Sequence, residues 1–174
     1  MVSFEEISKN KKSTVEEAFQ VFDALPPVKV EELIGWKWKG AEIVTGHPLE
    51  GLLDASGWFG KEFYDEDNGQ PLVVYNTDGN DGDDTFPCDP LLFFENATTG
   101  KPIRGQAATL EAKGSRCRLK TILHRGETTA SMFYDQTPIN DTFRKVNDTT
   151  IFGVMDNKAV PAPYFFYLVK YKKL

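Results

Sequence analysis

Residues 132–146 hold the densest group of side chains that could perform chemistry. Tyr134 and Asp135 stand before a proline turn, and Asp141 and Arg144 stand after it. The planar guanidinium of an arginine can hold a carboxylate or phosphate head group through two hydrogen bonds. If this segment forms a helical turn, Asp141 and Arg144 are neighbours and pair with each other. A ligand-binding role and a structural role for this pair therefore remain open.

His47 and Lys61 are the other polar candidates. His47 lies between Gly46 and Pro48, where a turn could point its imidazole into a binding site or bond it to the local backbone. Lys61 follows Gly60 and could place a cation at the mouth of a cavity. His47, Tyr134 and Asp135 are the candidate catalytic acids or bases.

Aromatic residues make up 13% of the chain, which is enough ring surface for a large core or a lined cavity. The candidate cavity linings are Trp38, Trp58, Phe133, Tyr134, Phe152, Tyr164 and Phe166. The candidate ligand-binding residues are Trp38, His47, Trp58, Lys61, Tyr134, Asp135, Asp141 and Arg144.

We expect no metal and no cofactor. The only histidines are His47 and His124, and zinc sites need three or four ligands at characteristic spacings. We expect Cys88 and Cys117 to be reduced thiols. Residues 77–90 are acidic, but their spacing fails the register of a calcium loop, so we expect a flexible loop that binds no ion.

The chain has 174 residues and a net charge of −6, which suits one domain over residues 1–174 and argues against a nucleic-acid partner. Its lysine-rich termini allow at most weak contact with an anionic membrane surface. The start of the chain lacks an apolar run, so we expect no signal peptide and a cytoplasmic location. A homodimer remains open.

The predicted elements are one capped helix followed by short strands. Thr14 and Glu17 form a capping-box pattern that predicts a helix over 14–25. Residues 36–45, 58–64, 71–76, 104–112, 116–123, 127–134, 150–155 and 164–171 read as strands. Residues 164–169 carry bulky side chains on both faces, which is typical of a barrel strand covered by helices outside. The predicted fold is mainly β, a single antiparallel barrel with one N-terminal helix and short covering helices.

Several segments resemble the GXWXG domain family and the domain of unknown function that usually follows it. They are Gly35–Gly40, Thr45–Gly51 and Gly57–Lys61 in the first part, and Met132–Val146, Gly153–Lys158 and Tyr164–Leu168 in the second. Gly35 lies three residues before Trp38, where the family motif has two. The resemblance assigns residues 15–75 to the GXWXG-like part and 104–174 to the second part of the same barrel. It implies a calycin-like β-barrel that binds lipids or other apolar molecules.

The leading hypothesis is a barrel that binds a small apolar or amphipathic ligand of the lipid or fatty-acid class. The alternative is a cofactor-free isomerase, cyclase or lyase that acts on an apolar metabolite in the barrel cavity. A packed barrel that serves only as an interaction protein is a third hypothesis. We expect Trp38, His47, Tyr134 and Arg144 to converge on one cavity, because the resemblance places them in its two signature segments.

Overall fold

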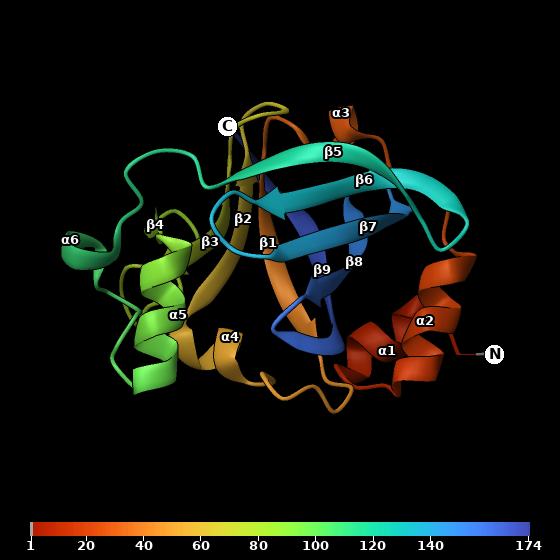
Figure 1. The fold of residues 1–174 in the computed structure, drawn as a ribbon, viewed down its shortest axis with the longest axis horizontal. Coiled ribbons are helices and arrows are strands. Elements are labelled where there is room, and N and C mark those ends of the chain that lie inside the picture. Colours follow the sequence, from red (N-terminus) through yellow and green to blue (C-terminus); the bar gives the residue numbers. More distant parts are fainter. Residues whose placement is uncertain (1) are drawn as a thin grey trace.

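A nine-stranded antiparallel sheet forms the centre of the computed structural model, which describes residues 2–174 (Figure 1). Its strands are β1 (Trp36–Ile43), β2 (Trp58–Phe63), β3 (Gly69–Tyr75), β4 (Thr85–Pro87), β5 (Cys117–His124), β6 (Glu127–Tyr134), β7 (Ile139–Asn147), β8 (Thr150–Asn157) and β9 (Val160–Lys173). They pair in the order β2-β1-β9-β8-β7-β6-β5-β3-β4, and β2 also pairs with β3. Eight strands therefore form a ring, with β4 added to its outside through β3. The prediction of a mainly antiparallel β fold is confirmed.

The ring is unevenly closed. Eight residue pairs join β5 to β6, whereas the pairing of β3 with β5 rests on Gly69 and Cys117 alone. Long regular strands thus make up most of the wall, and one short seam completes it.

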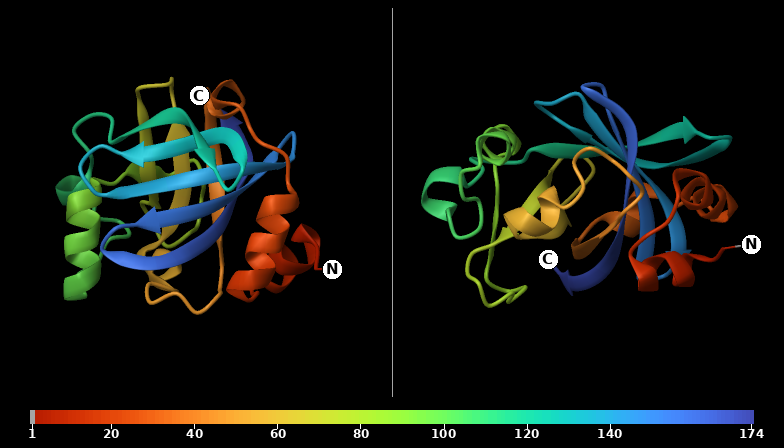
Figure 2. Two further views of the ribbon diagram at one scale, coloured as in Figure 1. Left: turned by 45° about the vertical axis from the view of Figure 1, so that its right-hand side comes forward. Right: turned by 90° about the horizontal axis from the view of Figure 1, so that it is seen from below.

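Six helices accompany the sheet within residues 2–174. They are α1 (Phe4–Asn10), α2 (Val15–Ala24), α3 (Val30–Leu33), α4 (Leu52–Ser56), α5 (Pro90–Thr99) and α6 (Ala107–Leu110). Helix α2 confirms the predicted N-terminal helix: the Thr14 hydroxyl accepts from the Glu17 amide at 3.1 Å, and the Glu17 carboxylate accepts from the Thr14 amide. Helices α1 and α2 lie on one side of the ring, and α5 and α6 lie on the opposite side (Figure 2).

Strand β9 has the two apolar faces that its sequence predicts. Phe166 and Leu168 belong to the larger apolar cluster inside the ring. Phe165 belongs to a second cluster outside it, where it packs with Phe22 of α2 and Ile7 of α1. The N-terminal helices therefore cover the outer face of this part of the sheet, as expected for a strand buried on both faces.

Two local predictions are wrong. Residues 104–112 form no strand, because Gly105 adopts a left-handed φ of +74° and the next residues form α6. Residues 77–90 are not one flexible loop, because Thr85–Pro87 pair with β3 as β4. Residues 139–147 form β7, so the helical turn that would make Asp141 and Arg144 neighbours does not form.

Within residues 2–174, no helix is long and apolar enough to cross a membrane. Met1, the first residue of the predicted domain, lies outside the described residues.

Candidate functional site

A buried ion pair crosses the inside of the ring between β2 and β7. The ammonium Nζ of Lys61 lies 2.7 Å from Oδ2 of Asp141, and the two side chains are only 3% and 2% exposed. The same ammonium donates a hydrogen bond of 3.1 Å to the Pro71 carbonyl. Such a pair is stable in an apolar interior only because each charge has its partner.

Aromatic rings surround the Lys61 ammonium. Nζ lies 5.7 Å from the ring centre of Trp58, 5.6 Å from that of Tyr134 and 5.2 Å from that of Phe166. The negative faces of aromatic rings attract a cation at these distances. The rings therefore supply part of the stabilisation that water would give an exposed lysine.

The strands explain why these side chains point inward. Side chains alternate along a strand, so Asp141 and Phe143 of β7 share the inner face. In β2, Lys61 and Phe63 share that face in the same way. The pairing of β2 with β3 shifts on both sides of Gly60, and this irregularity lets Trp58 also reach the inside.

A cavity lies beside the ion pair. Its lining residues come from both halves of the chain and are mostly apolar: Leu49, Leu52, Leu53, Trp58, Lys61, Leu72, Phe94, Tyr134, Asp141, Met155, Tyr164 and Phe166. The volume of the cavity is about 40 Å³. The cavity is therefore small, and it is called the slot below.

Two buried polar atoms of the lining residues have no hydrogen-bond partner. They are Oδ1 of Asp141, an acceptor, and Nε1 of Trp58, a donor. Burial raises the pKa of the Asp141 carboxyl, and the Lys61 ammonium opposes this shift. Burial also raises the pKa of Tyr134, which keeps the phenol protonated at neutral pH. The slot thus offers hydrogen-bonding groups in an otherwise apolar wall.

His47 lies next to the cavity without lining it. Its Nδ1 accepts from the Leu49 amide at 3.0 Å, and its ring meets the Tyr164 ring edge-on at 5.1 Å. The Tyr164 hydroxyl donates to the Glu42 carboxylate. Burial lowers the pKa of His47, so the imidazole is neutral at pH 7.

The structure brings together half of the predicted ligand-binding residues. Trp58, Lys61, Tyr134 and Asp141 line the cavity. Trp38, His47, Asp135 and Arg144 do not line it, so the predicted convergence of Trp38, His47, Tyr134 and Arg144 is wrong.

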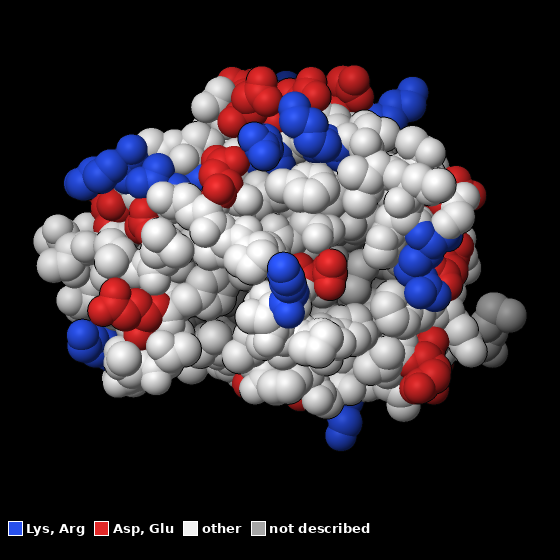
Figure 3. Space-filling view, in the orientation of Figure 1, with Lys and Arg blue, Asp and Glu red and all other residues white. Residues whose placement is uncertain are grey.

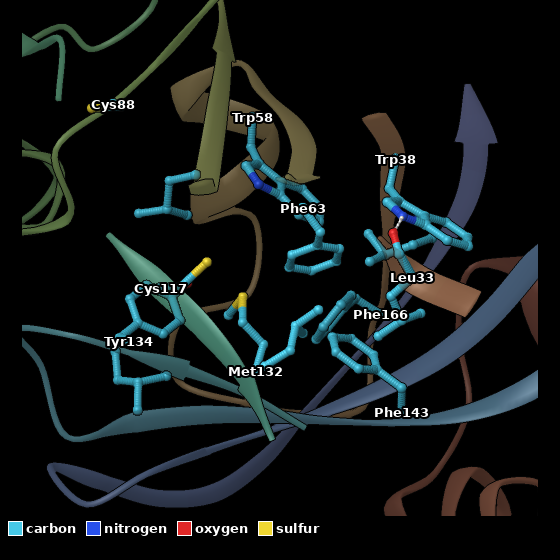
Figure 4. Close-up of a cluster of buried hydrophobic side chains, with 14 of the residues drawn as sticks. Leu33, Trp38, Trp58, Phe63, Cys88, Cys117, Met132, Tyr134, Phe143 and Phe166 are labelled. Carbon is cyan, nitrogen blue, oxygen red and sulfur yellow. Dashed lines mark hydrogen bonds between the residues drawn. The ribbon is translucent and has the colours of Figure 1, made fainter. Parts of the chain in front are cut away.

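Trp38 and Asp135 occupy other surroundings. The Trp38 indole is buried in the core, where Nε1 donates to the Leu33 carbonyl at 3.0 Å (Figure 4). Asp135 is exposed after β6 and lies 4.0 Å from Arg118. Trp38 therefore fills the core at a distance from the slot, and Asp135 faces solvent.

Arg144 lies on the opposite face of β7 from Asp141. Positions three apart in a strand point to opposite faces, so these two residues cannot form the expected pair. The Arg144 guanidinium donates to the carbonyls of His124 at 3.0 Å and of Leu25 at 3.4 Å, and it lies over the Phe22 ring. Arg144 thus ties the β5–β6 turn to the end of α2.

His124, the last residue of β5, is partly buried. Its ring meets the Phe22 ring edge-on at 5.9 Å. Burial lowers the pKa of this imidazole too.

The lining residues that sequence reasoning missed are aliphatic or lie on an unpredicted helix. Leu49, Leu52 and Leu53 come from the turn before α4 and from α4 itself, and Phe94 comes from α5. The signal for α5 was present, because Asp89 caps its start and Pro90 occupies its first position.

Cys88 and Cys117 are buried free thiols. Burial raises the pKa of Cys88 to about 12 and also raises the pKa of Cys117. Burial therefore keeps both thiols protonated at neutral pH, although the Lys61 ammonium opposes this effect at Cys117. In the described part of the chain, no group of three histidine, cysteine or acidic side chains could hold a metal ion.

Comparison with known proteins confirms the resemblance seen in the sequence. Residues 20–79 match the GXWXG protein family, and residues 115–170 match the domain of unknown function DUF4334. A crystal structure of a protein from Thermomonospora curvata is similar, with 28% sequence identity and a TM-score of 0.72. The similarity covers 97% of this chain and 95% of that one. No curated protein matches the chain.

Proposed function

We propose that this chain, in which a GXWXG region is followed by a DUF4334 region, binds a small apolar or amphipathic ligand inside a calycin-like barrel. The observation that carries this proposal is the slot beside the Lys61–Asp141 pair. Apolar side chains line it, and few polar groups interrupt them. Such walls with sparse polar groups are typical of small-molecule sites.

The small volume of the slot limits the size of the ligand. About 40 Å³ is room for only a few water molecules, so side chains of the wall must move to admit any larger molecule. A single alkyl chain of the lipid or fatty-acid class needs less of this movement than a fused-ring compound. The leucines of α4 and its preceding turn would adjust to its length.

The ring acts as one domain in this proposal. Strand β1 of the GXWXG region pairs with β9 of the DUF4334 region over residues 36–43. The ion pair joins the same two regions, because Lys61 belongs to the first and Asp141 to the second. Both regions are therefore needed to build the site.

The proposed partner is a small molecule and not a nucleic acid. On the face shown in Figure 3, the Lys and Arg side chains are interspersed with Asp and Glu and are separated by broad uncharged stretches. That mixture lacks the continuous basic surface that phosphate backbones attract. We also propose that the protein is located in the cytoplasm and makes at most weak contact with membranes.

The experiment is native mass spectrometry of the purified protein, followed by extraction and identification of any bound small molecule. The Leu52→Trp variant fills the slot with a larger side chain and should abolish the bound mass. The matched control is Leu91→Trp, because Leu91 lies on the exposed side of α5. A bound mass that survives Leu52→Trp would place the ligand elsewhere and overturn the proposal.

A second candidate function is a cofactor-free isomerase or lyase. The observation that favours it is the meeting of a buried carboxylate, a lysine and a phenol on one wall of the slot. Asp141 would take a proton from carbon and Tyr134 or Lys61 would return one, in place of the predicted His47 and Asp135. Proton exchange between 2-hexanone and D2O, followed by NMR, tests this candidate. Catalysis by the folded wild-type protein that Asp141→Asn removes would support it, and exchange at the uncatalysed rate would exclude this ketone as substrate.

A further inference from the structure

We infer that the ligand presents a neutral hydroxyl group to Oδ1 of Asp141. This inference rests on the proposed function and narrows it from amphipathic molecules in general to alcohols. The two oxygens of the Asp141 carboxylate have different surroundings. Oδ2 accepts from Lys61, whereas Oδ1 is buried without any donor.

A buried carboxylate oxygen without a donor is costly. The loss of its hydration is normally offset by at least one hydrogen bond, and an unsatisfied group of this kind raises the free energy of the folded protein. No side chain of the lining donates to Oδ1. We take this donor to be the hydroxyl group of the molecule that occupies the slot.

Trp58 lines the same slot and carries an unpaired hydrogen-bond donor. Its indole Nε1 has no acceptor. A hydroxyl group both donates and accepts, whereas an ether or a ketone only accepts. An alcohol is therefore a simple uncharged ligand that can donate to Oδ1 and can also accept from a donor such as Nε1.

Charge argues against an acidic head group at this position. The Lys61–Asp141 pair is already neutral as a unit, so a ligand carboxylate would meet the Asp141 charge without a free cation to balance it. It would also lose its water against apolar walls, which costs far more than burying a hydroxyl. Arg144, the residue expected to clamp an acid, lies on the outer face of β7 among backbone carbonyls.

Charge also argues against an amine. A ligand ammonium could donate to Oδ1, but it would stand close to the Lys61 ammonium, which lies 2.7 Å from the other oxygen of the same carboxylate. Two ammonium groups on the same carboxylate repel each other strongly in an apolar site. A neutral donor avoids both forms of repulsion.

The test compares three chain-matched probes by titration calorimetry at pH 7, namely 1-hexanol, its isomer methyl pentyl ether, and hexanoate. The NMR signal of the Met155 methyl group reports whether a probe enters the slot. We expect 1-hexanol to bind about tenfold or more tightly than the ether, because it alone donates to a charged acceptor. We expect hexanoate to bind more weakly than both.

The outcomes separate this inference from the proposed function. Equal binding of alcohol and ether in the slot would overturn the hydroxyl assignment and leave the proposed function standing; a water molecule on Oδ1 would produce that result. Tighter binding of hexanoate would replace the alcohol with an acid. Failure of all three to perturb Met155 would overturn the proposed function as well.

Asp141→Asn provides an independent check. The amide oxygen would accept from Lys61 and the amide nitrogen would face the slot as a donor. The preference for 1-hexanol over the ether should then fall to about one. Asp135→Asn, outside the slot, should leave the preference unchanged. If Asp141→Asn does not fold, the double variant Lys61→Met with Asp141→Leu removes both charges together, and it should show the same loss of preference.

Discussion

The Nζ atom of Lys61 on β2 lies 2.7 Å from Oδ2 of Asp141 on β7, inside a ring of eight strands. This contact joins the GXWXG region to the DUF4334 region, and both side chains line a mostly apolar slot. The second carboxylate oxygen of Asp141 is buried without a hydrogen-bond partner. The proposed function therefore makes stability and binding depend on the same pair of side chains.

Replacing Lys61 by methionine should destabilise the protein by about 3–5 kcal/mol, because it leaves the Asp141 charge buried without its partner. Urea unfolding at pH 7 measures this loss. The control is Lys145→Met, which removes solvent-accessible pairs with Glu32 and Asp148 and should destabilise the protein much less. Adding Asp141→Leu to Lys61→Met should recover most of the stability. Equal losses of stability in the two lysine variants would show that the buried pair contributes no more to stability than an exposed pair.

Gly40→Ala should displace the Trp58 ring. A Cβ atom at position 40 would stand 2.1 Å from the nearest atom of that ring, which is far inside van der Waals contact. We expect a loss of about 1–3 kcal/mol from overpacking, together with a changed tryptophan fluorescence spectrum. Gly79→Ala is the matched control, because its Cβ would find only ordinary contact. An unchanged spectrum and stability in Gly40→Ala would mean that this strand does not hold Trp58 in place.

Arg144→Ala should lower the free energy of unfolding and leave ligand affinity unchanged. The substitution removes hydrogen bonds to the His124 and Leu25 carbonyls and empties the space over Phe22. We expect the free energy of unfolding to fall by about 2–4 kcal/mol, because two buried carbonyls lose their hydrogen-bond donor and a cavity remains. Urea unfolding and titration with 1-hexanol measure the two quantities separately. Weaker 1-hexanol binding at a temperature where the variant is folded would restore Arg144 as a binding residue.

Asp23→Asn should change how stability depends on pH. Its two carboxylate oxygens each lie 2.6 Å from the Arg125 guanidinium, and this hydrogen bonding lowers the pKa of Asp23 below its ordinary value of 3.8. Because the pKa is lower in the folded protein, the ionised carboxylate stabilises it above about pH 3.8. That contribution is lost as the pH falls through the folded pKa.

Urea unfolding at pH 7 and at pH 2 measures this difference. Asp23→Asn should be less stable than the wild type by under about 1 kcal/mol at pH 7, since the pair is partly exposed, and the gap should close at pH 2. The exposed Asp78→Asn serves as the control. A gap of the same size at both pH values would contradict the assigned role of the carboxylate charge.

The parts of the fold that the sequence predicts well are those with local signals. The Thr14–Glu17 capping box marks the start of α2, and the alternating bulky residues of β9 predict a strand covered on both faces. The same kind of signal was present for α1, where Ser3 and Glu6 form a capping box. Ser3 and Glu6 therefore predict the start of that helix in the same way.

The candidate site was predicted only in part, because its geometry depends on contacts between distant segments. Asp141 and Arg144 looked like a helical pair, but the period of a strand places them on opposite faces. The true partner of Asp141 is Lys61, and only closure of the ring brings β2 and β7 to face each other. Strand order and register of this kind leave no trace in residue spacing along the chain.

A crystal structure of the protein soaked with 1-hexanol tests the central claim most directly. The account predicts one alcohol molecule in the slot, with its alkyl chain against Leu52 and Leu53. Its hydroxyl oxygen should lie at hydrogen-bond distance, about 2.7 Å, from Oδ1 of Asp141. A slot that stays free of alcohol at saturating concentration, or a bound alcohol whose hydroxyl points away from Asp141, would contradict the account.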